Sequence, residues 1–275
     1  MTTLFVFVIG IAIGSFLNVL IDRLPKGEAI TGRSHCDYCR KKILWYDLIP
    51  VFSFLILHGK TRCCNKKLSF QYPLVEIITG ISFTFIIVIP NEVRNLATEG
   101  GVKLFDYALL DPSGIALRMT MLGIVSCLII IFFSDLRYHL ISDYILLALF
   151  IFSLPAVALA KEGPLLSILF NSLASGLIVA LPIFLLYYLS RERAMGLGDV
   201  YLSAIIGFIL GWKSGYIALY IAFVTGAIYG ISLLLLKNRK LKSRIAFGPF
   251  LVIGLVTMLF WADKIYGLID MIYKY

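Results

Sequence analysis

Residues 196–212 read GLGDVYLSAIIGFILGW, a glycine-flanked aspartate followed by an apolar run. The apolar run has the composition of a membrane span, yet Asp199 stands at its beginning. A carboxylate at the edge of a membrane segment is unfavourable, so such a residue is a candidate functional group. The alternative is a helix cap, because an aspartate accepts hydrogen bonds from the first free N–H groups of a helix. The stretch therefore predicts a membrane helix that begins with either a catalytic acid or a cap.

The composition of the whole chain is that of a polytopic membrane protein. Of its 275 residues, 60% are hydrophobic and 15% are charged, and the mean hydropathy is +0.93, which excludes an ordinary water-soluble domain. The net charge of +9 could suit nucleic acid, but in a membrane protein excess Lys and Arg usually mark cytoplasmic loops near anionic headgroups. We therefore expect contact with membrane lipid and no nucleic-acid partner.

Eight stretches are apolar enough to cross a bilayer core of about 30 Å as helices. They are residues 2–22, 72–90, 115–134, 143–160, 165–189, 199–212, 215–236 and 245–262. The first lacks the charged start and cleavage site of a signal peptide, so it is predicted as a retained span. The expected fold is an all-α integral membrane protein with about eight transmembrane helices.

The polar stretches between the spans divide the chain into four predicted parts. These are a first transmembrane helix at 1–22, a cytoplasmic cysteine-containing loop at 23–71, a second helix with an external loop at 72–114, and a six-helix membrane domain at 115–275. Placing the first loop in the cytoplasm puts 18 of the 25 lysines and arginines on that side, as the positive-inside rule requires. Both termini then face outside.

Two aspartates share one membrane face in either orientation. Asp135 ends the third span, within SDLRYHLISD, and Asp199 begins the sixth, with two crossings between them. Two aspartates in one site titrate as a coupled pair, in which one holds a proton while the other activates water for attack on an amide. The pair therefore predicts aspartyl protease chemistry.

Three further residues are candidates for substrate binding. Gly196 and Gly198 remove side-chain bulk beside Asp199, which would let an extended peptide lie against the acid. Glu76 lies a turn inside the second span, where a carboxylate needs a partner. It could support a site or satisfy a polar contact.

The loop after the first span carries four of the five cysteines. CDYC occupies residues 36–39, and the adjacent Cys63 and Cys64 follow 24 residues later. Two cysteine pairs are typical of a tetrahedral zinc site, and a cytoplasmic loop keeps thiols reduced. Because the second pair is adjacent rather than spaced, the fourth ligand beside Cys36, Cys39 and Cys64 is left open between Cys63, a histidine and water.

Several segments together resemble the bacterial type IV prepilin peptidases, which belong to the GxGD intramembrane aspartyl proteases. They are GSFLNVLIDRLP at 14–25, CDYC at 36–39, WYDLIPVFSFLILHGK at 45–60, LSFQYPLVE at 68–76, SDLRYHLISD at 134–143, GLGDV at 196–200 and FGPFL at 247–251. The resemblance implies an enzyme of the bacterial inner membrane that removes the basic leader from prepilins or pseudopilins at the cytoplasmic face. It also implies N-methylation of the new amino terminus, with S-adenosylmethionine as methyl donor.

Carried over residue by residue, the resemblance makes Asp135 and Asp199 the catalytic pair, with Gly196 and Gly198 shaping the loop before the second aspartate. It makes the loop around CDYC at 36–39 a zinc-bearing region linked to methylation.

The chain departs from the family pattern at three places. The family usually has a second C-x-x-C, whose first cysteine is Thr61 here, while Cys64 matches its last and Cys63 can replace the missing one. Tyr201 stands where a lysine is common, and Ser142 where a proline is frequent. The first departure concerns the metal and methyl transfer, and the other two leave the aspartates intact.

Two other functions are compatible with the same residues. A transporter would use Glu76, Asp135 and Asp199 to bind protons or cations. A non-catalytic scaffold of a pilus or secretion machine would use the cysteine loop for docking. Asp199→Asn distinguishes a protease from these alternatives, because it abolishes leader cleavage in a protease and leaves the assembly function of a scaffold intact.

Overall fold

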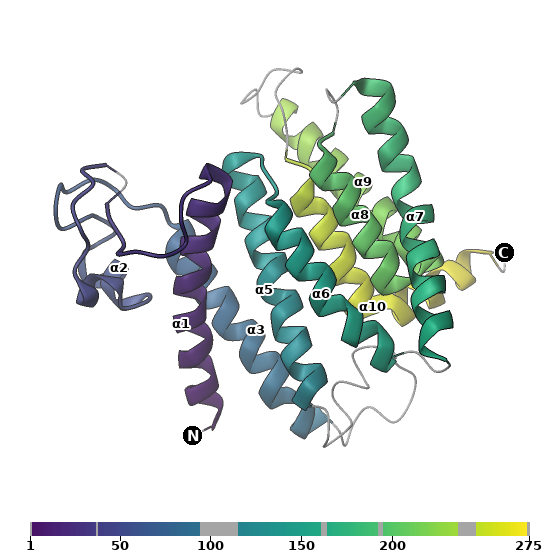
Figure 1. Ribbon diagram of the computed structural model, residues 1–275, viewed down its shortest axis with the longest axis horizontal. Coiled ribbons are helices and arrows are strands. Elements are labelled where there is room, and N and C mark those ends of the chain that lie inside the picture. Colours follow the sequence, from purple (N-terminus) through teal and green to yellow (C-terminus); the bar gives the residue numbers. More distant parts are fainter. Residues whose placement is uncertain are drawn as a thin grey trace. The chain divides into compact units, whose positions relative to one another are not determined.

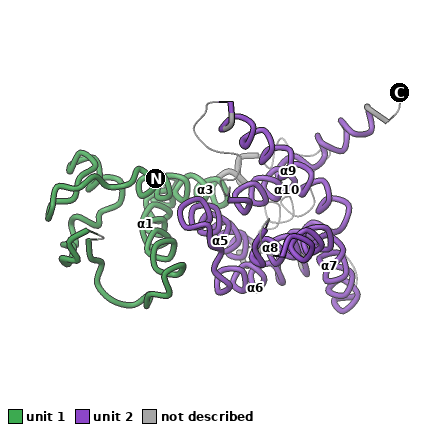
Figure 2. Tube along the Cα trace, turned by 90° about the horizontal axis from the view of Figure 1, so that it is seen from above, with its two compact units in different colours: residues 1–92 green, residues 93–275 purple. Residues whose placement is uncertain are grey.

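The structure is a computed structural model of the chain, and it describes residues 2–36, 38–93, 115–160, 164–191, 195–235 and 246–273. The secondary structure of these residues is helical, apart from two isolated β-bridges. The chain forms two compact units, residues 1–92 and residues 93–275 (Figure 2).

Unit 1 consists of two long helices with the cysteine-containing loop between them (Figure 1). Its elements are α1 (Thr2–Arg23), η1 (Leu24–Lys26), η2 (Trp45–Leu48), α2 (Phe52–Ile56) and α3 (Gln71–Val93).

Small residues bring α1 and α3 close together. A Cβ on Gly10 would lie 2.7 Å from the Cα of Gly80, and a Cβ on Gly14 would lie 2.7 Å from the Cα of Glu76. Close approach at glycines four residues apart is typical of helix pairs in membranes. Gly10 faces Gly80 and Gly14 faces Glu76, so residue numbers increase along α1 while those of the facing residues decrease along α3. The two helices are therefore antiparallel.

Unit 2 is a helical bundle with α8 surrounded by other helices (Figures 1 and 2). Its described helices are α5 (Ile115–Tyr138), α6 (Asp143–Ala160), α7 (Leu165–Ser190), α8 (Leu197–Leu210), α9 (Trp212–Leu235) and α10 (Gly248–Tyr273). Helix α8 contacts α6, α7, α9 and α10, and most of its residues are buried. Because protein rather than lipid surrounds it, its length need not match the thickness of the hydrocarbon core.

Glycines bring α8 against α7. A Cβ on Gly176 would lie 2.7 Å from the carbonyl oxygen of Ala204, and a Cβ on Gly207 would lie 2.7 Å from that of Ser175. These neighbours are backbone atoms, so a side chain at either position would force the helices apart. Gly211 follows α8 with a φ of +82°, which allows α9 to begin at the next residue.

The all-α prediction is confirmed, and eight described helices coincide with the eight predicted stretches to within a few residues, except at one end. Helix α10 continues to Tyr273, well past the predicted end at residue 262, and its backbone is non-helical at Trp261 (φ −129°, ψ 20°). Six of the described helices, α1, α3, α5, α7, α9 and α10, are long and apolar enough to cross a membrane, whereas α6 and α8 are shorter.

Some predictions fall on residues that the structure does not describe. Most of the expected external loop, residues 94–114, lies outside the described residues, as does the basic stretch at 236–245. The division of the chain at residues 22, 71 and 114 stays a prediction.

Candidate functional site

Asp199 lies in the first turn of α8 and is buried, with 8% of its surface exposed. Gly196 precedes the helix in an extended conformation (φ −88°, ψ 161°), and its N–H donates to Asp199 Oδ2 at 3.2 Å. This contact is the reach-back half of a capping box. The helix-cap interpretation thus holds for one carboxyl oxygen, while Oδ1 accepts no hydrogen bond from the described residues.

Asp135 lies in the last turn of α5 and is also buried, with 5% of its surface exposed. Its Oδ2 accepts the N–H of Gly248, the first residue of α10, at 2.8 Å. The first N–H groups of a helix have no partner within the helix, and they lie at the positive end of its dipole. The start of α10 therefore stabilises a carboxylate at Asp135.

Gly248 is a site residue to which the sequence analysis assigned no role. A Cβ at this position would lie 2.7 Å from Asp135 Oδ2, so no larger residue fits without moving the carboxyl. The available signal was the FGPFL motif, in which a glycine and a proline begin an apolar run. That signal indicates a helix start, but it does not say which carboxylate the helix start meets.

The turn after Asp135 is fixed by local hydrogen bonds. His139 has a φ of +53°, and its N–H donates to the carbonyl oxygen of Asp135 at 2.9 Å. The hydroxyl of Ser134 donates to the carbonyl oxygen of Leu140 at 2.9 Å. These bonds set the position of Ile141, which follows directly.

The structure brings Asp135 and Asp199 together. The charge of Asp135 acts on Asp199, so the two carboxyl groups are near enough to repel each other when both are ionised. Ile141 packs beside both groups, because its side chain would lie 3.0 Å from a Cβ on Gly198 and 3.1 Å from a Cβ on Gly248. Three helix ends, those of α5, α8 and α10, therefore meet around Ile141.

The two glycines before Asp199 have different surroundings. A Cβ on Gly198 would press on Ile141, whereas the nearest atoms to a Cβ on Gly196 are 4.0 Å away. Neither glycine has a positive φ. Both glycines were expected to leave room for an extended peptide, and the surroundings of Gly196 fit that expectation. Gly198 instead allows α8 to begin close to the turn at Ile141.

Four cysteine sulfurs of unit 1 form a cluster. The Sγ atoms of Cys36, Cys39, Cys63 and Cys64 all lie within 4.8 Å of one another, with 3.7 Å between Cys36 and Cys64 and 3.2 Å between Cys39 and Cys63. With a Zn–S bond of about 2.3 Å, the sulfurs of a tetrahedral site lie roughly 3.8 Å apart. The cluster could therefore hold a metal ion through four thiolates.

Two turns with the same backbone pattern, 25 residues apart, present these sulfurs. In the first turn the N–H of Arg40 donates to the carbonyl oxygen of Cys36 at 2.9 Å, and in the second the N–H of Asn65 donates to that of Thr61 at 2.8 Å. Arg40 and Asn65 both have a positive φ, 58° and 54°, and an isolated β-bridge closes each turn. Thr61 is therefore the structural equivalent of Cys36.

The equivalence explains the adjacent pair of cysteines. Cys64 occupies the position that Cys39 has in the first turn, and Cys63 supplies the sulfur that Thr61 lacks. The hydroxyl of Thr61 lies 3.1 Å from Cys64 Sγ. This hydrogen bond is the main cause that lowers the pKa of the Cys64 thiol to about 7, whereas hydrogen bonding with Cys39 raises the pKa of Cys63 to about 12.

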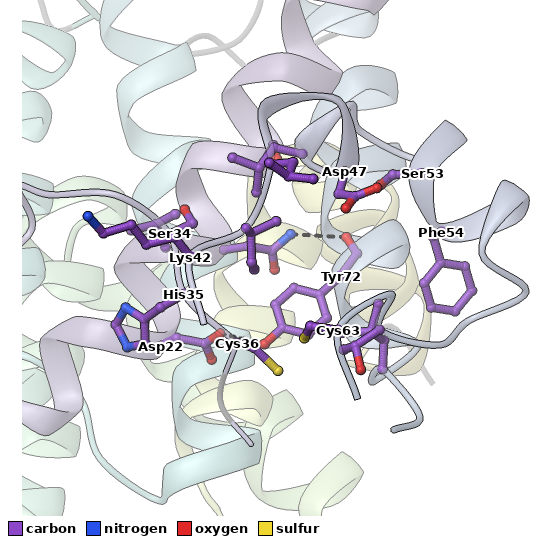
Figure 3. Close-up of a pocket in the computed structure, with 18 of the residues that line it drawn as sticks. Asp22, Ser34, His35, Cys36, Lys42, Asp47, Ser53, Phe54, Cys63 and Tyr72 are labelled. Atoms are coloured by element: carbon purple, nitrogen blue, oxygen red, sulfur yellow. Dashed lines mark hydrogen bonds between the residues drawn. The ribbon is translucent and has the colours of Figure 1, made fainter. Parts of the chain in front are cut away.

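A cavity of about 510 Å³ lies within unit 1, beside the cysteine cluster (Figure 3). The helices and the cluster contribute polar groups to its wall: Asn18, Asp22, Cys36, Cys63, Tyr72 and Glu76. Glu76, the third acid that the sequence analysis singled out, thus lines a cavity of unit 1. Its Oε2 accepts the N–H of Val51 at 2.8 Å.

Comparisons with known proteins match both units. The model of the bacterial peptidase A24 N-terminal domain matches residues 8–89, which include the cysteine cluster, and the model of the type IV leader peptidase family matches residues 122–231, which include both aspartates. No solved structure matches.

Several curated relatives carry the name prepilin leader peptidase/N-methyltransferase. That of Bacillus subtilis (strain 168) is 30% identical over 94% of this chain and 94% of the relative. That of Aeromonas salmonicida (strain A449) is 29% identical over 94% and 91%, and that of Pectobacterium carotovorum subsp. carotovorum is 30% identical over 90% and 88%. Together with the six membrane-length helices, these matches indicate an integral protein of the bacterial inner membrane. Aligned over nearly its whole length with these relatives, the chain belongs to the prepilin leader peptidase/N-methyltransferase family.

Proposed function

We propose that this protein removes the basic leader from type IV prepilins or pseudopilins, with Asp135 and Asp199 as its catalytic acids. Membership of the family supports the reaction. One observation carries the assignment of residues: two buried carboxyls lie near each other, and the N–H of a glycine at a helix start holds one oxygen of each.

The mechanism follows from this arrangement. Repulsion between neighbouring carboxylates favours a state in which the pair keeps one proton. The ionised carboxyl removes a proton from water, the resulting hydroxide attacks the scissile carbonyl carbon, and the protonated carboxyl donates its proton to the carbonyl oxygen. Collapse of the intermediate breaks the C–N bond, and a proton passes to the leaving amine. The glycine N–H groups keep both carboxyls oriented throughout.

The substrate peptide lies extended beside Gly196, where no atom comes within 4.0 Å of a Cβ. An extended segment is needed because the carbonyl groups of a helix are occupied by hydrogen bonds. The positive leader is attracted to anionic headgroups by about 1 kcal/mol per Lys or Arg. A basic leader followed directly by an apolar helix therefore brings the scissile bond to the height of the acids.

The membrane topology is part of the proposal. Helices α6 and α8 cross the membrane in addition to the six longer helices, which makes eight crossings. The cysteine loop and both aspartates face the cytoplasm, and both termini face outside. The excess of Lys and Arg in the loops assigned to the cytoplasm supports this orientation.

The cysteine cluster binds one structural zinc ion. A set of four thiolates is typical of closed, tetrahedral zinc sites, and the distances between sulfurs fit that geometry. All four positions are filled by protein, so the metal holds the loop together and does not activate water.

N-methylation of the new amino terminus is the second activity. When bound, S-adenosylmethionine would supply the methyl group, with its sulfur keeping the electron pair of the broken S–CH₃ bond and the amine losing a proton as the N–CH₃ bond formed. The cavity beside the cysteine cluster fits a small molecule of this kind, because its volume of about 510 Å³ is within the usual range of about 300–1,000 Å³.

Mass spectrometry of a prepilin tests both activities. The prepilin is co-expressed with the wild type, with Asp199→Asn or with Asp143→Asn in a bacterium that lacks its own prepilin peptidase. Asp143 is an exposed aspartate at the start of α6 and serves as the matched control. We expect a shortened, methylated amino terminus with the wild type and the control, and an intact leader with Asp199→Asn. An intact leader with the wild type would instead favour a transporter or a scaffold, and complete cleavage by Asp199→Asn would show that Asp199 is not a catalytic acid.

A further inference from the structure

The surroundings of helix α10 change at Trp261. The backbone of this residue is non-helical, so two helical parts meet there at a kink. Most of residues 248–260 are buried and none is exposed, whereas none of residues 261–271 is buried. Figures 1 and 2 show the part after the kink, residues 262–273, leading away from the other helices of unit 2. We call this part the terminal segment, and the described parts of the chain leave much of it uncovered.

The terminal segment lies at the end of unit 2 opposite the aspartate pair. Helix α10 begins at Gly248, which contacts Asp135, and the segment is at its other end. Helix α8 carries Asp199 in its first turn, and α9 starts after the other end of α8. The hydroxyl groups of Ser214, near the start of α9, and Tyr266 lie 2.8 Å apart. This contact joins the terminal segment to the end of the bundle away from the acids.

The start of α9 marks the level of the membrane surface at this end. Helix α9 has 24 residues and is apolar enough to cross a membrane. Its length of about 36 Å exceeds the bilayer core of about 30 Å, so both of its ends reach the surface. Trp212 at its start and Trp261 at the kink are 51% and 50% exposed, and tryptophan is enriched where a membrane meets water. The kink therefore lies at the membrane–water boundary.

The sequence of the terminal segment is that of an amphipathic helix. Residues 261–273 read WADKIYGLIDMIY. The isoleucines and leucine at 265, 268, 269 and 272 recur at the spacing of one helix face, and Asp263, Tyr266 and Asp270 fall on the opposite face. Leu268 is 61% exposed although it is apolar. A helix with one apolar face that protein does not cover is typical of helices that lie in the plane of a membrane surface.

The charges of the segment favour the boundary over the bilayer core and over an anionic surface. The segment carries two acids, Asp263 and Asp270, and one base, Lys264. A crossing that continued through these residues would place carboxylates in lipid, which is unfavourable. Surface helices that depend on anionic lipid are rich in Lys and Arg, and this segment is not. Burial of its apolar face is therefore the force that remains to hold it.

We propose that the terminal segment binds the phospholipid surface on the side of the membrane opposite the aspartate pair. It lies flat in the membrane–water boundary, with Ile265, Leu268 and Ile269 among the acyl chains and Asp263 and Asp270 in water. Interfacial anchors set the tilt and depth of membrane helices, so the segment fixes the depth of α10, whose other end holds Asp135. The inference does not rest on the peptidase assignment.

Spin labels on opposite faces of the segment test the proposal. Leu268→Cys and Asp270→Cys are exposed positions in the same turn. Each full chain, with its metal, is spin-labelled and placed singly in a lipid nanodisc, and the wild type treated with the same reagent gives the signal of the native cysteines. Electron paramagnetic resonance measures collisions of the label with oxygen, which concentrates among acyl chains, and with chromium oxalate, which stays in water. We expect the ratio of oxygen to chromium collisions to be several-fold higher at residue 268 than at residue 270. The contrast should be the same in phosphatidylcholine with and without phosphatidylglycerol.

Each other outcome overturns the proposal. Preference for chromium at both positions would place the segment in water, and preference for oxygen at both would mean that α10 continues through the bilayer. Shielding of residue 268 from both reagents would mean that the chain itself covers the apolar face, because each disc holds one copy. A contrast confined to discs with phosphatidylglycerol would show that apolar burial is insufficient.

A second pair of variants keeps the test decisive. Elution as a single species and leader removal at the wild-type rate report on the folding of each variant. If Leu268→Cys or Asp270→Cys fails these checks, Ile265→Cys and Asp263→Cys repeat the comparison one turn earlier on the same two faces. A wild type that removes no leader would contradict the peptidase assignment alone, since the collision ratios do not depend on catalysis.

Discussion

The cysteine cluster and the aspartate pair position their side chains in opposite ways. The cysteines furthest apart in sequence are separated by only 28 residues, and two short turns arrange them. Asp135 and the glycine that holds it are separated by 113 residues, and helix ends set their positions. The cluster therefore depends on its own ligands, whereas the acid pair depends on the packing of the bundle in unit 2. Substitutions in the loop should change metal content and methylation, and substitutions at the helix ends should change leader removal.

The largest effect is expected when an acid is removed. Asp135→Asn and Asp199→Asn should each lower the rate of leader removal by about 10²–10⁴-fold, the usual range for general acid–base catalysis. Because the two acids act as a unit, the double variant should be no slower than the slower single variant. Cleavage rates in membranes at matched protein levels measure this. Independent, multiplying effects would show that the two carboxyls do not act on one reaction, and a loss of metal would contradict the separation between the two regions.

Removal of a metal ligand should affect only the cysteine loop. Cys63→Ser should lower zinc affinity by more than the roughly 10–100-fold that loss of an outer-shell partner causes, and leader removal should continue. Adding Thr61→Cys should restore the metal, because Thr61 is the equivalent of Cys36. Elemental analysis after dialysis against a chelator measures both, and Cys127→Ser in α5 is the control. Unchanged zinc affinity in Cys63→Ser would mean that the fourth ligand is not this sulfur.

Gly248→Ala should show how strongly the acid pair depends on distant packing. The added Cβ would lie 2.7 Å from Asp135 Oδ2, so the carboxyl must move, and misplacement by about 1 Å can lower a rate by about 10²-fold. Gly267→Ala adds the same atom to the same helix where nothing lies within 4 Å, and it should cleave at the wild-type rate. Equal rates for both variants would show that Asp135 does not need the start of α10.

The smallest effect concerns one hydrogen bond in the cysteine cluster. In metal-free protein the Thr61 hydroxyl stabilises the Cys64 thiolate and lowers its pKa to about 7, so Thr61→Val should raise that pKa. Alkylation of Cys64 by iodoacetamide should then be several-fold slower near pH 7, and the difference should vanish above about pH 9, where the thiolate predominates in both proteins. Peptide mass spectrometry across this pH range measures the rates. Identical pH profiles would exclude a role for the Thr61 hydroxyl.

Hydropathy and the count of crossings predicted most of the helical architecture. Each long apolar stretch has to become a helix in a membrane, so helix bounds are properties of local sequence. The expectation that Asp135 and Asp199 share a membrane face came from the even number of predicted crossings between them, and it stays a prediction. Neither argument reveals how a helix is rotated about its axis. For that reason the sequence did not predict that Gly198 faces Ile141 or that Gly248 meets Asp135.

The cysteine cluster shows a different limit of sequence analysis. The spacing of the cysteines predicted a metal site, but it left the fourth ligand open because adjacent side chains usually diverge. The backbone of the second turn, with its positive φ at Asn65, places the sulfur atoms of Cys63 and Cys64 in the same cluster. Asn65 favours this conformation more than most residues do, yet only comparison with Arg40 in the first turn shows that the two turns are equivalent.

Because each of the two turns supplies two of the four cysteines, a bound metal would cross-link the turns. With a metal bound, Cys39 and Cys63 close the chain between them into a ring, and closing a ring of this size in a flexible chain has an entropic cost that rises with the logarithm of its length. Val51, about halfway around the ring, is fixed a second time through its N–H bond to Glu76. The loop is then held at two points, by the metal between Cys39 and Cys63 and by the hydrogen bond between Val51 and Glu76 of α3. Loss of the metal removes the cross-link between Cys39 and Cys63 and leaves the hydrogen bond at Val51 in place.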